Sequence, residues 1–145
     1  MTLSSLRNTS DDKLVAGVRI FLAVMFLMTG AMKLLVPVLA EAWAGQLLAA
    51  GIPLRELSRL TVPYLELALG ALLAVGAFVR PAAATVIGIM AVATYVHLVV
   101  DDPSLFPLQP SEPIIPLIVI ALSLVVLRRG AGARSLDLNA TRRSS

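Results

Sequence analysis

LVAGVRIFLAVMFLMTGAMKLLV, which runs from Leu14 to Val36, is the stretch of sequence that decides the fold. A helix rises about 1.5 Å per residue, so about 20 consecutive apolar residues cross the roughly 30 Å hydrocarbon core of a bilayer. Three further stretches approach this length, over residues 60–79, 81–100 and 113–127. The sequence therefore predicts an all-α integral membrane protein, an antiparallel bundle of four transmembrane helices that forms a single domain over residues 1–145.

The fourth stretch is the shortest of the four, with an apolar run from Pro113 to Leu127. A helix of this length falls short of the hydrocarbon core. We therefore expect this helix to begin earlier, near Phe106, or to lie in a locally thinned bilayer.

The composition agrees with a membrane protein and excludes several other classes. Of the 145 residues, 58% are hydrophobic and 14% are charged, and the mean hydropathy is +0.89, which differs strongly from ordinary soluble domains. The chain has no cysteine, which excludes a disulfide relay, a thiolate nucleophile, an iron–sulfur cluster and a cysteine-ligated zinc. Its single histidine is too few for a histidine-rich metal site, so we expect no metal. The basic residues form no continuous face, so we expect no nucleic acid partner.

Lysine and arginine predict the orientation, because basic residues are retained on the cytoplasmic side of a membrane. With the N-terminus inside, all but three of the twelve basic residues lie inside, the exceptions being Lys33, Arg55 and Arg59. We therefore expect both termini to be cytoplasmic. A cleaved signal peptide ending near Ala40-Glu41-Ala42 is the alternative for the first stretch, but that stretch is too long for one and contains Lys33.

The chain between the first two stretches, EAWAGQLLAAGIPLRELSRL, predicts an interfacial helical segment. Trp43, Leu47 and Leu48 share one helical face, and a tryptophan there would anchor the segment at the membrane surface. Gly51-Ile52-Pro53 would end it.

The connections and the ends of the chain are short or polar. Only Arg80-Pro81 separates the second and third stretches, which predicts a tight cytoplasmic turn. Residues 1–12 and 138–145 lack hydrophobic periodicity, so we expect them to be flexible cytoplasmic tails.

Ionisable side chains occur inside the predicted spans, where each costs at least about 2.5 kcal/mol near the bilayer centre and therefore needs a partner, a water path or a function. Lys33, Glu66 and His97 lie on three different helices at similar distances from the outer ends. Facing inward, they would form a polar pocket in which Glu66 binds a polar or cationic group, or relays a proton with His97. Tyr64 and Tyr95 are close in sequence and would supply hydroxyl groups. These five residues are the candidate ligand-binding site.

Structural interpretations of the same residues stay open. Lys33 can extend to the membrane surface, and Glu66 with Lys33 can form an ion pair that only joins two helices. A lone histidine near a helix end is more often a structural residue than a catalyst. The glycines and alanines that recur along the spans would pack helices closely without any ligand.

A second polar set is predicted at the cytoplasmic ends of the helices. Arg19 lies near the start of the first span and Arg80 in the expected turn, and RRGAGARSLDLN follows the last span. The glycines of that segment would let the chain turn back under the bundle and bring Ser135 and Asp137 toward either arginine. We expect Arg19, Arg80, Ser135 and Asp137 to form a structural latch.

Together these motifs resemble the DoxX family of small four-helix bacterial membrane proteins. The resemblance covers about residues 15–138. It rests on Arg19, Gly30-x-x-Lys33-Leu34, Gly51-Ile52-Pro53, Glu66-x-x-x-Gly70, Gly76-x-x-x-Arg80 and Gly130-x-Gly132-x-x-Ser135-Leu136-Asp137. Ala131 stands where the family often has proline.

The resemblance implies an accessory protein of the bacterial plasma (inner) membrane. One member of the family it resembles belongs to quinol oxidase and thiosulfate–quinone oxidoreductase systems, and mycobacterial members associate with superoxide dismutase and a sulfurtransferase. Because this chain has no cysteine, redox work would fall to a bound quinone or to a partner. We therefore expect a non-catalytic subunit that holds a quinone-like or lipid-like molecule, with the bilayer, redox proteins and further copies of the chain as partners.

Two other functions remain as alternatives. One is a structural or assembly protein without a ligand of its own. The other, a proton or small-solute transporter, is disfavoured because a path across the membrane needs polar residues at several depths and the sequence shows one polar layer and no repeat. An autonomous enzyme is disfavoured because no nucleophile with its base, metal-ligand set or phosphate loop is evident.

Overall fold

The structure, a computed structural model, describes residues 9–101 and 110–144, and all regular secondary structure in this part is helical, with no strand. Its helices are α2 (Lys13–Leu35), α3 (Pro37–Ala49), α4 (Arg55–Val75), α5 (Val79–Val99), α6 (Ile114–Arg129) and α7 (Leu136–Ser144). Within the described part, α2, α4 and α5 are the three helices long and apolar enough to cross a membrane. Helix α6 has 16 residues and is about 24 Å long. The prediction that this helix begins earlier, near Phe106, is wrong, because α6 begins at Ile114 after its cap residue Pro113 and residues 110–113 are not helical. Its placement in a locally thinned bilayer remains a prediction.

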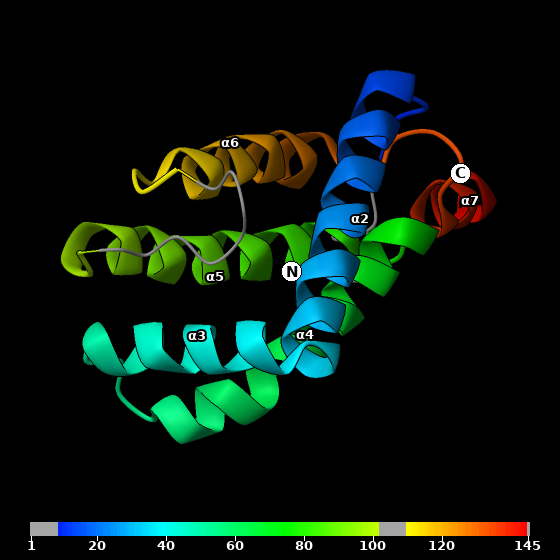
Figure 1. Ribbon diagram of the computed structural model, residues 1–145. Helices are drawn as coiled ribbons and strands as arrows, with labels where there is room; N and C mark the ends of the chain where they lie inside the picture. Colours follow the sequence, from blue (N-terminus) through cyan, green and yellow to red (C-terminus); the bar gives the residue numbers. More distant parts are fainter. Residues whose placement is uncertain (1–8, 102–109, 145) are drawn as a thin grey trace.

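The helices pack as two pairs that meet at a common core. Helices α5 and α6 lie side by side and run in opposite directions, and α2 packs against α4 (Figure 1). In this view α2 crosses the α5–α6 pair instead of running along it. Antiparallel packing of four spanning helices therefore remains a prediction.

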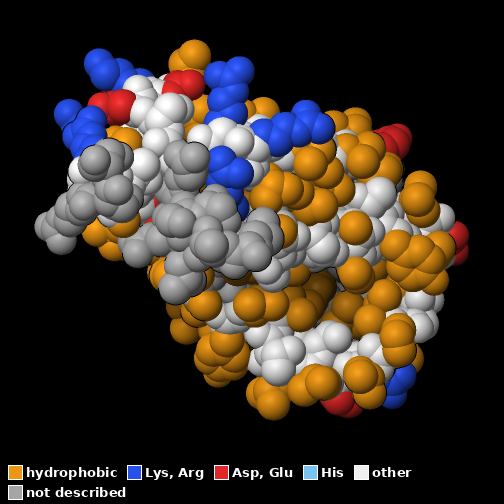
Figure 2. Space-filling model, turned by 180° about the vertical axis from the view of Figure 1, so that it is seen from behind, with side chains coloured by type: hydrophobic (Ala, Val, Ile, Leu, Met, Phe, Trp, Pro, Cys, Tyr) orange, Lys and Arg blue, Asp and Glu red, His pale blue; other side chains and the backbone are white. Residues whose placement is uncertain are grey.

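The outer surface of the helices is hydrophobic. Hydrophobic side chains cover most of the face shown in Figure 2, and most of its lysine and arginine side chains gather at one end. The exposed residues include Phe21, Val24, Val92 and Leu117. Apolar surface on this scale is costly in water and is expected where a protein meets lipid.

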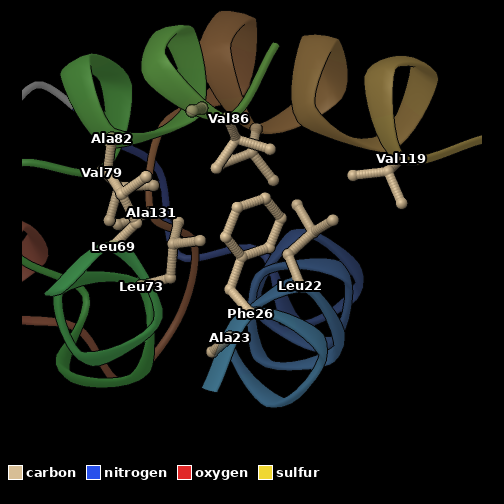
Figure 3. Close-up of a cluster of buried hydrophobic side chains, with 12 residues drawn as sticks. Leu22, Ala23, Phe26, Leu69, Leu73, Val79, Ala82, Val86, Val119 and Ala131 are labelled. Atoms are coloured by element: carbon tan, nitrogen blue, oxygen red, sulfur yellow. The ribbon is translucent and has the colours of Figure 1, made fainter. Parts of the chain in front are cut away.

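The core is formed by side chains from four helices. Phe26 of α2, only 2% exposed, lies at its centre with Leu22 beside it (Figure 3). Leu73 of α4, Val86 of α5 and Val119 of α6 complete the surrounding wall. Because the cluster contains side chains from both helix pairs, it joins the two pairs.

Several boundaries differ from the sequence predictions. Helix α4 begins at Arg55, before the expected start at residue 60 and directly after the turn that contains Gly51-Ile52-Pro53. The prediction that Arg80-Pro81 forms the connection between α4 and α5 is wrong, because Arg80 lies in the first turn of α5. Gly76, at φ 70°, ends α4 instead, a backbone conformation that glycine adopts without strain.

The described parts of the two chain ends, residues 9–12 and 138–144, make regular contacts instead of forming the flexible tails expected at 1–12 and 138–145, whose residues 1–8 and 145 lie outside the described part. Residues up to Ser144 continue as α7, and Leu138 is buried. The backbone N–H of Leu138 donates to Ser135 Oγ at 3.1 Å, which caps the new helix. Thr9 is also buried, and its hydroxyl oxygen accepts from the N–H of Gly132 at 2.9 Å. Residues 9–12 and α7 therefore belong to the folded unit.

Helices α2 and α4 approach each other closely because glycine occupies the contact on each side. A Cβ atom on Gly30 of α2 would lie 2.8 Å from the carbonyl oxygen of Pro63. A Cβ atom on Gly70 of α4 would lie 2.7 Å from Leu27 Cγ. Small residues at such positions allow helix backbones to pack tightly within lipid.

Gly30→Ala should therefore destabilise the protein. The added methyl group meets backbone, which cannot rotate away, so we expect a loss of about 1–3 kcal/mol in the free energy of unfolding. Gly17→Ala is the matched control on the same helix, because nothing lies within 4 Å of its Cβ position, and it should be neutral or stabilising. Unfolding titrations in mixed detergent micelles would measure both. Equal stabilities for the two variants would contradict a tight α2–α4 contact.

Candidate functional site

Lys33 and Glu66 form a buried ion pair that joins α2 to α4. Lys33 Nζ donates to Glu66 Oε1 at 2.5 Å, and the two side chains are 10% and 2% exposed. The close contact at Gly30 places Glu66 there, since Glu66 Cβ is 3.1 Å from the Cβ position of Gly30. Lys33 lies one turn further along the same face of α2. The pair is therefore a direct result of how the two helices pack.

Trp43 of α3 covers the ammonium group from another side. Lys33 Nζ lies 4.8 Å from the centroid of the Trp43 ring, within range of a cation–π attraction. The chain reaches this position because α2 ends at Leu35, Val36 is extended and Pro37 begins a new helix. From the sequence, Trp43 was expected only at the membrane surface, without a contact to Lys33.

The second carboxylate oxygen of Glu66 has a different environment. Oε2 is buried and has no hydrogen-bond partner within the described part of the chain. A buried acceptor left without a partner costs about 1–3 kcal/mol. Glu66 therefore joins the helices through Oε1, while Oε2 is a buried acceptor without a partner in the described residues.

The remaining residues of the candidate site contact other segments. His97 Nδ1 lies 2.8 Å from the carbonyl oxygen of Ser111, and since a carbonyl only accepts, Nδ1 must donate. The Tyr95 hydroxyl donates to the carbonyl of Ala50 at 3.3 Å, and the Tyr64 side chain is 58% exposed. The structure thus brings Lys33 and Glu66 together, whereas the contacts shown for His97 and Tyr95 tie α5 to neighbouring connections.

Arg19 occupies the opposite end of α2 and is 2% exposed. Its guanidinium group donates to backbone carbonyls at the end of α4 and in the segment after α6. The acceptors are Leu73, Ala74 at 2.8 Å, Ala131 at 2.8 Å, Ala133 at 3.4 Å and Arg134 at 3.4 Å. The last carbonyls of a helix carry partial negative charge and lack helical partners. One buried cation therefore satisfies the end of α4 and holds the returning chain.

Asp137, 1% exposed, caps α5 from a distant part of the chain. Its Oδ1 accepts from the N–H of Phe78 at 3.1 Å and its Oδ2 from the N–H of Val79 at 3.0 Å. Ser135 lies against the turn, since a Cβ atom on Gly76 would overlap Ser135 Cβ. Three of the four latch residues, Arg19, Ser135 and Asp137, thus surround one turn.

Arg80 makes a neighbouring contact. Its guanidinium donates to the carbonyl of Arg128 at 3.2 Å and so joins α5 to the end of α6.

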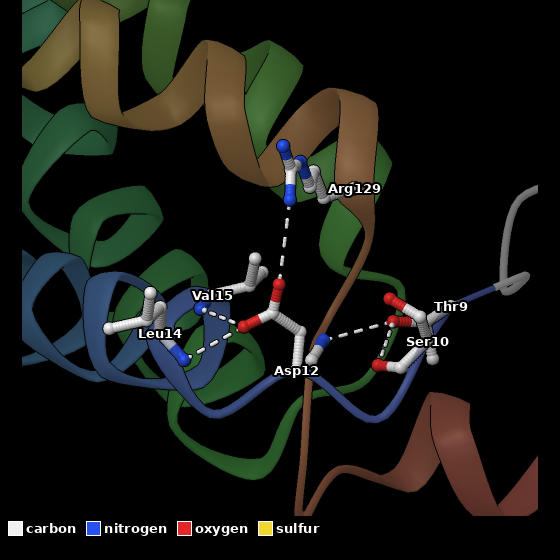
Figure 4. Close-up of polar contacts among 7 residues, drawn as sticks. Thr9, Ser10, Asp12, Leu14, Val15 and Arg129 are labelled. Atoms are coloured by element: carbon white, nitrogen blue, oxygen red, sulfur yellow. Dashed lines mark hydrogen bonds and ion pairs between the residues drawn. The ribbon is translucent and has the colours of Figure 1, made fainter.

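The N-terminal segment is a further part of this region that the sequence interpretation missed. Asp12 Oδ1 accepts from the N–H groups of Leu14 and Val15, at 2.9 and 3.2 Å, and caps α2 (Figure 4). Its other oxygen lies 3.6 Å from an Arg129 nitrogen (Figure 4). An aspartate directly before an apolar helical run is a recognised cap signal, so this contact could have been predicted.

The fold and these contacts define a helical membrane protein with a carboxylate buried between two of its helices. In the described residues, no group of three or more His, Cys, Asp or Glu could hold a metal ion. The family model DoxX matches residues 14–98, more than half of the chain, so the chain belongs to the DoxX family. No curated protein and no solved structure matches it. The family predicted from the motifs is therefore confirmed.

Asp137→Ala should destabilise the latch. It removes the acceptor of the buried N–H of Val79 and of the part-buried N–H of Phe78, and each orphaned donor costs about 1–3 kcal/mol, so we expect a total loss of roughly 2–6 kcal/mol. Asp11→Ala is the control, because Asp11 forms an exposed ion pair with Arg142 at 2.7 Å and such pairs contribute about 0–1 kcal/mol. Unfolding titrations in micelles would compare the two. A stable Asp137→Ala variant would show that the cap is dispensable.

Lys33→Met should destabilise the protein by about 3 kcal/mol, because it leaves a buried carboxylate without its cation. The double variant Lys33→Met with Glu66→Leu should recover most of this loss, since a buried pair can often be replaced by apolar groups of similar volume. A double-mutant cycle of unfolding free energies measures the coupling. Additive effects would mean that the two side chains are energetically independent.

Proposed function

We propose that this DoxX-family protein is a non-catalytic membrane subunit that binds a quinone-like or lipid-like small molecule for a membrane redox system. The observation that carries the proposal is Glu66 Oε2, an acceptor that is buried and has no partner in the described part of the chain. A hydroxyl group of a quinol or a lipid could donate to this oxygen and remove the cost of leaving it unsatisfied. The link to redox systems rests on the family resemblance.

The apolar character of the protein supports a ligand of this class. The face shown in Figure 2 has a hollow bordered by hydrophobic atoms. Binding sites for small molecules combine such apolar walls with a few placed polar groups. A molecule dissolved in the bilayer, with one hydroxyl on an otherwise apolar body, fits this combination.

The proposal includes a place in the cell and a topology. Helix α6 serves as the fourth span beside α2, α4 and α5, and the protein lies in the bacterial inner membrane with both termini cytoplasmic. The gathering of lysine and arginine at one end of the surface (Figure 2) supports this orientation. The proposed partners are redox proteins of the same membrane or a second copy of the chain.

A structural role without a ligand is the second candidate. It is favoured by the 2.5 Å contact between Lys33 and Glu66, which joins α2 to α4 with no third group. Under this hypothesis the protein holds a larger membrane complex together, and the only role of Glu66 is to join α2 to α4.

Glu66→Gln separates the two candidates. The amide oxygen can still accept from Lys33, so we expect the variant to fold. If the amide nitrogen takes the place of Oε2, a donor meets the ligand hydroxyl, and retention of the ligand should fall at least tenfold, the effect of about 1.4 kcal/mol. Native mass spectrometry and solvent extraction of the protein, purified in mild detergent, would identify the retained molecule.

Glu41→Gln is the matched control, because Glu41 is an exposed glutamate on α3. It should leave retention unchanged. A Glu66→Gln variant that is less stable, from a protein that carries no small molecule before or after the change, would overturn the binding role and support the structural one.

A further inference from the structure

A groove lies between α3 and the first turns of α4. Its volume is about 220 Å³. One wall consists of small and leucine side chains between Ala44 and Leu48 of α3, and the other of Arg55, Glu56 and Arg59 of α4. Neither Lys33 nor Glu66 lines this groove. It is therefore a second candidate site, independent of the proposed function.

The charged wall has more hydrogen-bond donors, on Arg55 and Arg59, than the one carboxylate of Glu56 can accept from. Arg55 Nε lies 3.4 Å from Glu56 Oε1, and the nearest nitrogen of Arg59 lies 4.0 Å from Oε2. All three side chains are half or more exposed, and exposed pairs of this length are weak. Two guanidinium groups against one carboxylate leave a net positive charge. Arginine donors match the geometry of a phosphate group.

The groove also lies at a boundary between polar and apolar surface. Arg55 begins α4, one of the helices able to cross a membrane, so its charged first turn lies near the end of the apolar run. Leu48 on the opposite wall is 58% exposed. An occupant would meet guanidinium groups on one side and leucine on the other. Free phosphate would use only the charged side.

We propose that this groove binds the headgroup of an anionic phospholipid. The phosphate accepts hydrogen bonds from Arg55 and Arg59, and the first carbons of the acyl chains lie along Leu47 and Leu48. The lipid would fix α3 against α4 at the membrane surface. The positive charge selects anionic over zwitterionic headgroups, because each basic residue near a membrane surface favours anionic lipid.

Two variants test the two walls separately. Arg55→Gln with Arg59→Gln removes the charge and should lower retention of anionic lipid about fivefold per arginine, or about 25-fold together. Gly45→Leu fills the groove without changing charge, and nothing lies within 4 Å of the Cβ position of Gly45, so the protein should fold. This variant should also lose the lipid.

Arg129→Gln with Arg142→Gln is the matched control. It removes two exposed arginines, 66% and 62% exposed, that do not line the groove. Retention of anionic lipid should be unchanged in this variant. Glu66→Gln should also retain the lipid, so the failure of the proposed function and the failure of this site can be told apart.

The measurement is native mass spectrometry of the full chain released from nanodiscs that contain equal amounts of phosphatidylglycerol and phosphatidylcholine. We expect the wild-type protein to keep phosphatidylglycerol preferentially. Three results would overturn the proposal: no preference in the wild type, retention in Gly45→Leu equal to the wild type, or an equal loss in the arginine control. Displacement of the lipid by millimolar inorganic phosphate would also overturn it, because the groove would then recognise a free anion.

Discussion

The contact of α2 with α4 at Gly30 and Gly70 is the constraint on which the candidate site depends. In water, burial of apolar surface would bring two such helices together, but in lipid this driving force is absent and close van der Waals packing must replace it. At Gly30 that packing is close enough that a Cβ atom would lie 2.8 Å from the backbone of Pro63. The distance between helix axes then determines which side chains can meet, and Lys33 with Glu66 is the pair that does.

At the other end of the molecule, the latch stabilises the turn between α4 and α5. The α4–α5 turn contains Phe78 at φ 49°, a left-handed conformation that costs energy for a residue with a side chain. Asp137 accepts hydrogen bonds from Phe78 and from Val79, and Arg19 satisfies the carbonyls that α4 leaves behind. A carboxylate at the start of α5 and a guanidinium at the end of α4 each oppose the local helix dipole. The turn is thus held by residues far away in the chain.

The parts of this structure that could be predicted from sequence are those set by local pattern. Apolar length correctly predicted α2, α4 and α5 as helices able to span a membrane, whereas α6 is too short to count among them. Gly51-Ile52-Pro53 correctly predicted the end of α3. The Lys33–Glu66 ion pair was one of the interpretations that the sequence left open, because both side chains are costly in lipid and their charges are opposite. In these cases the chemistry of a few neighbouring residues decides the result.

What could not be predicted depends on the direction of helices in space. His97 was grouped with Lys33 and Glu66 by its distance from a helix end, but that distance says nothing about the face on which a side chain lies. The contact shown for His97 is with Ser111 in the connection before α6. Likewise the groove between α3 and α4 requires the chain to turn back at Leu54, whose φ of 54° is unusual for a leucine and carries no sequence signal.

The two oxygens of Glu66 show how structure and binding can share one residue. A carboxylate used only to join helices would gain most by satisfying both oxygens, because a buried acceptor without a partner is costly. Glu66 satisfies only Oε1 with Lys33, and the cation–π contact with Trp43 directs the ammonium group to a fixed place. Within the described residues Oε2 has no hydrogen-bond partner, and this cost favours the proposed bound molecule over a purely structural pair.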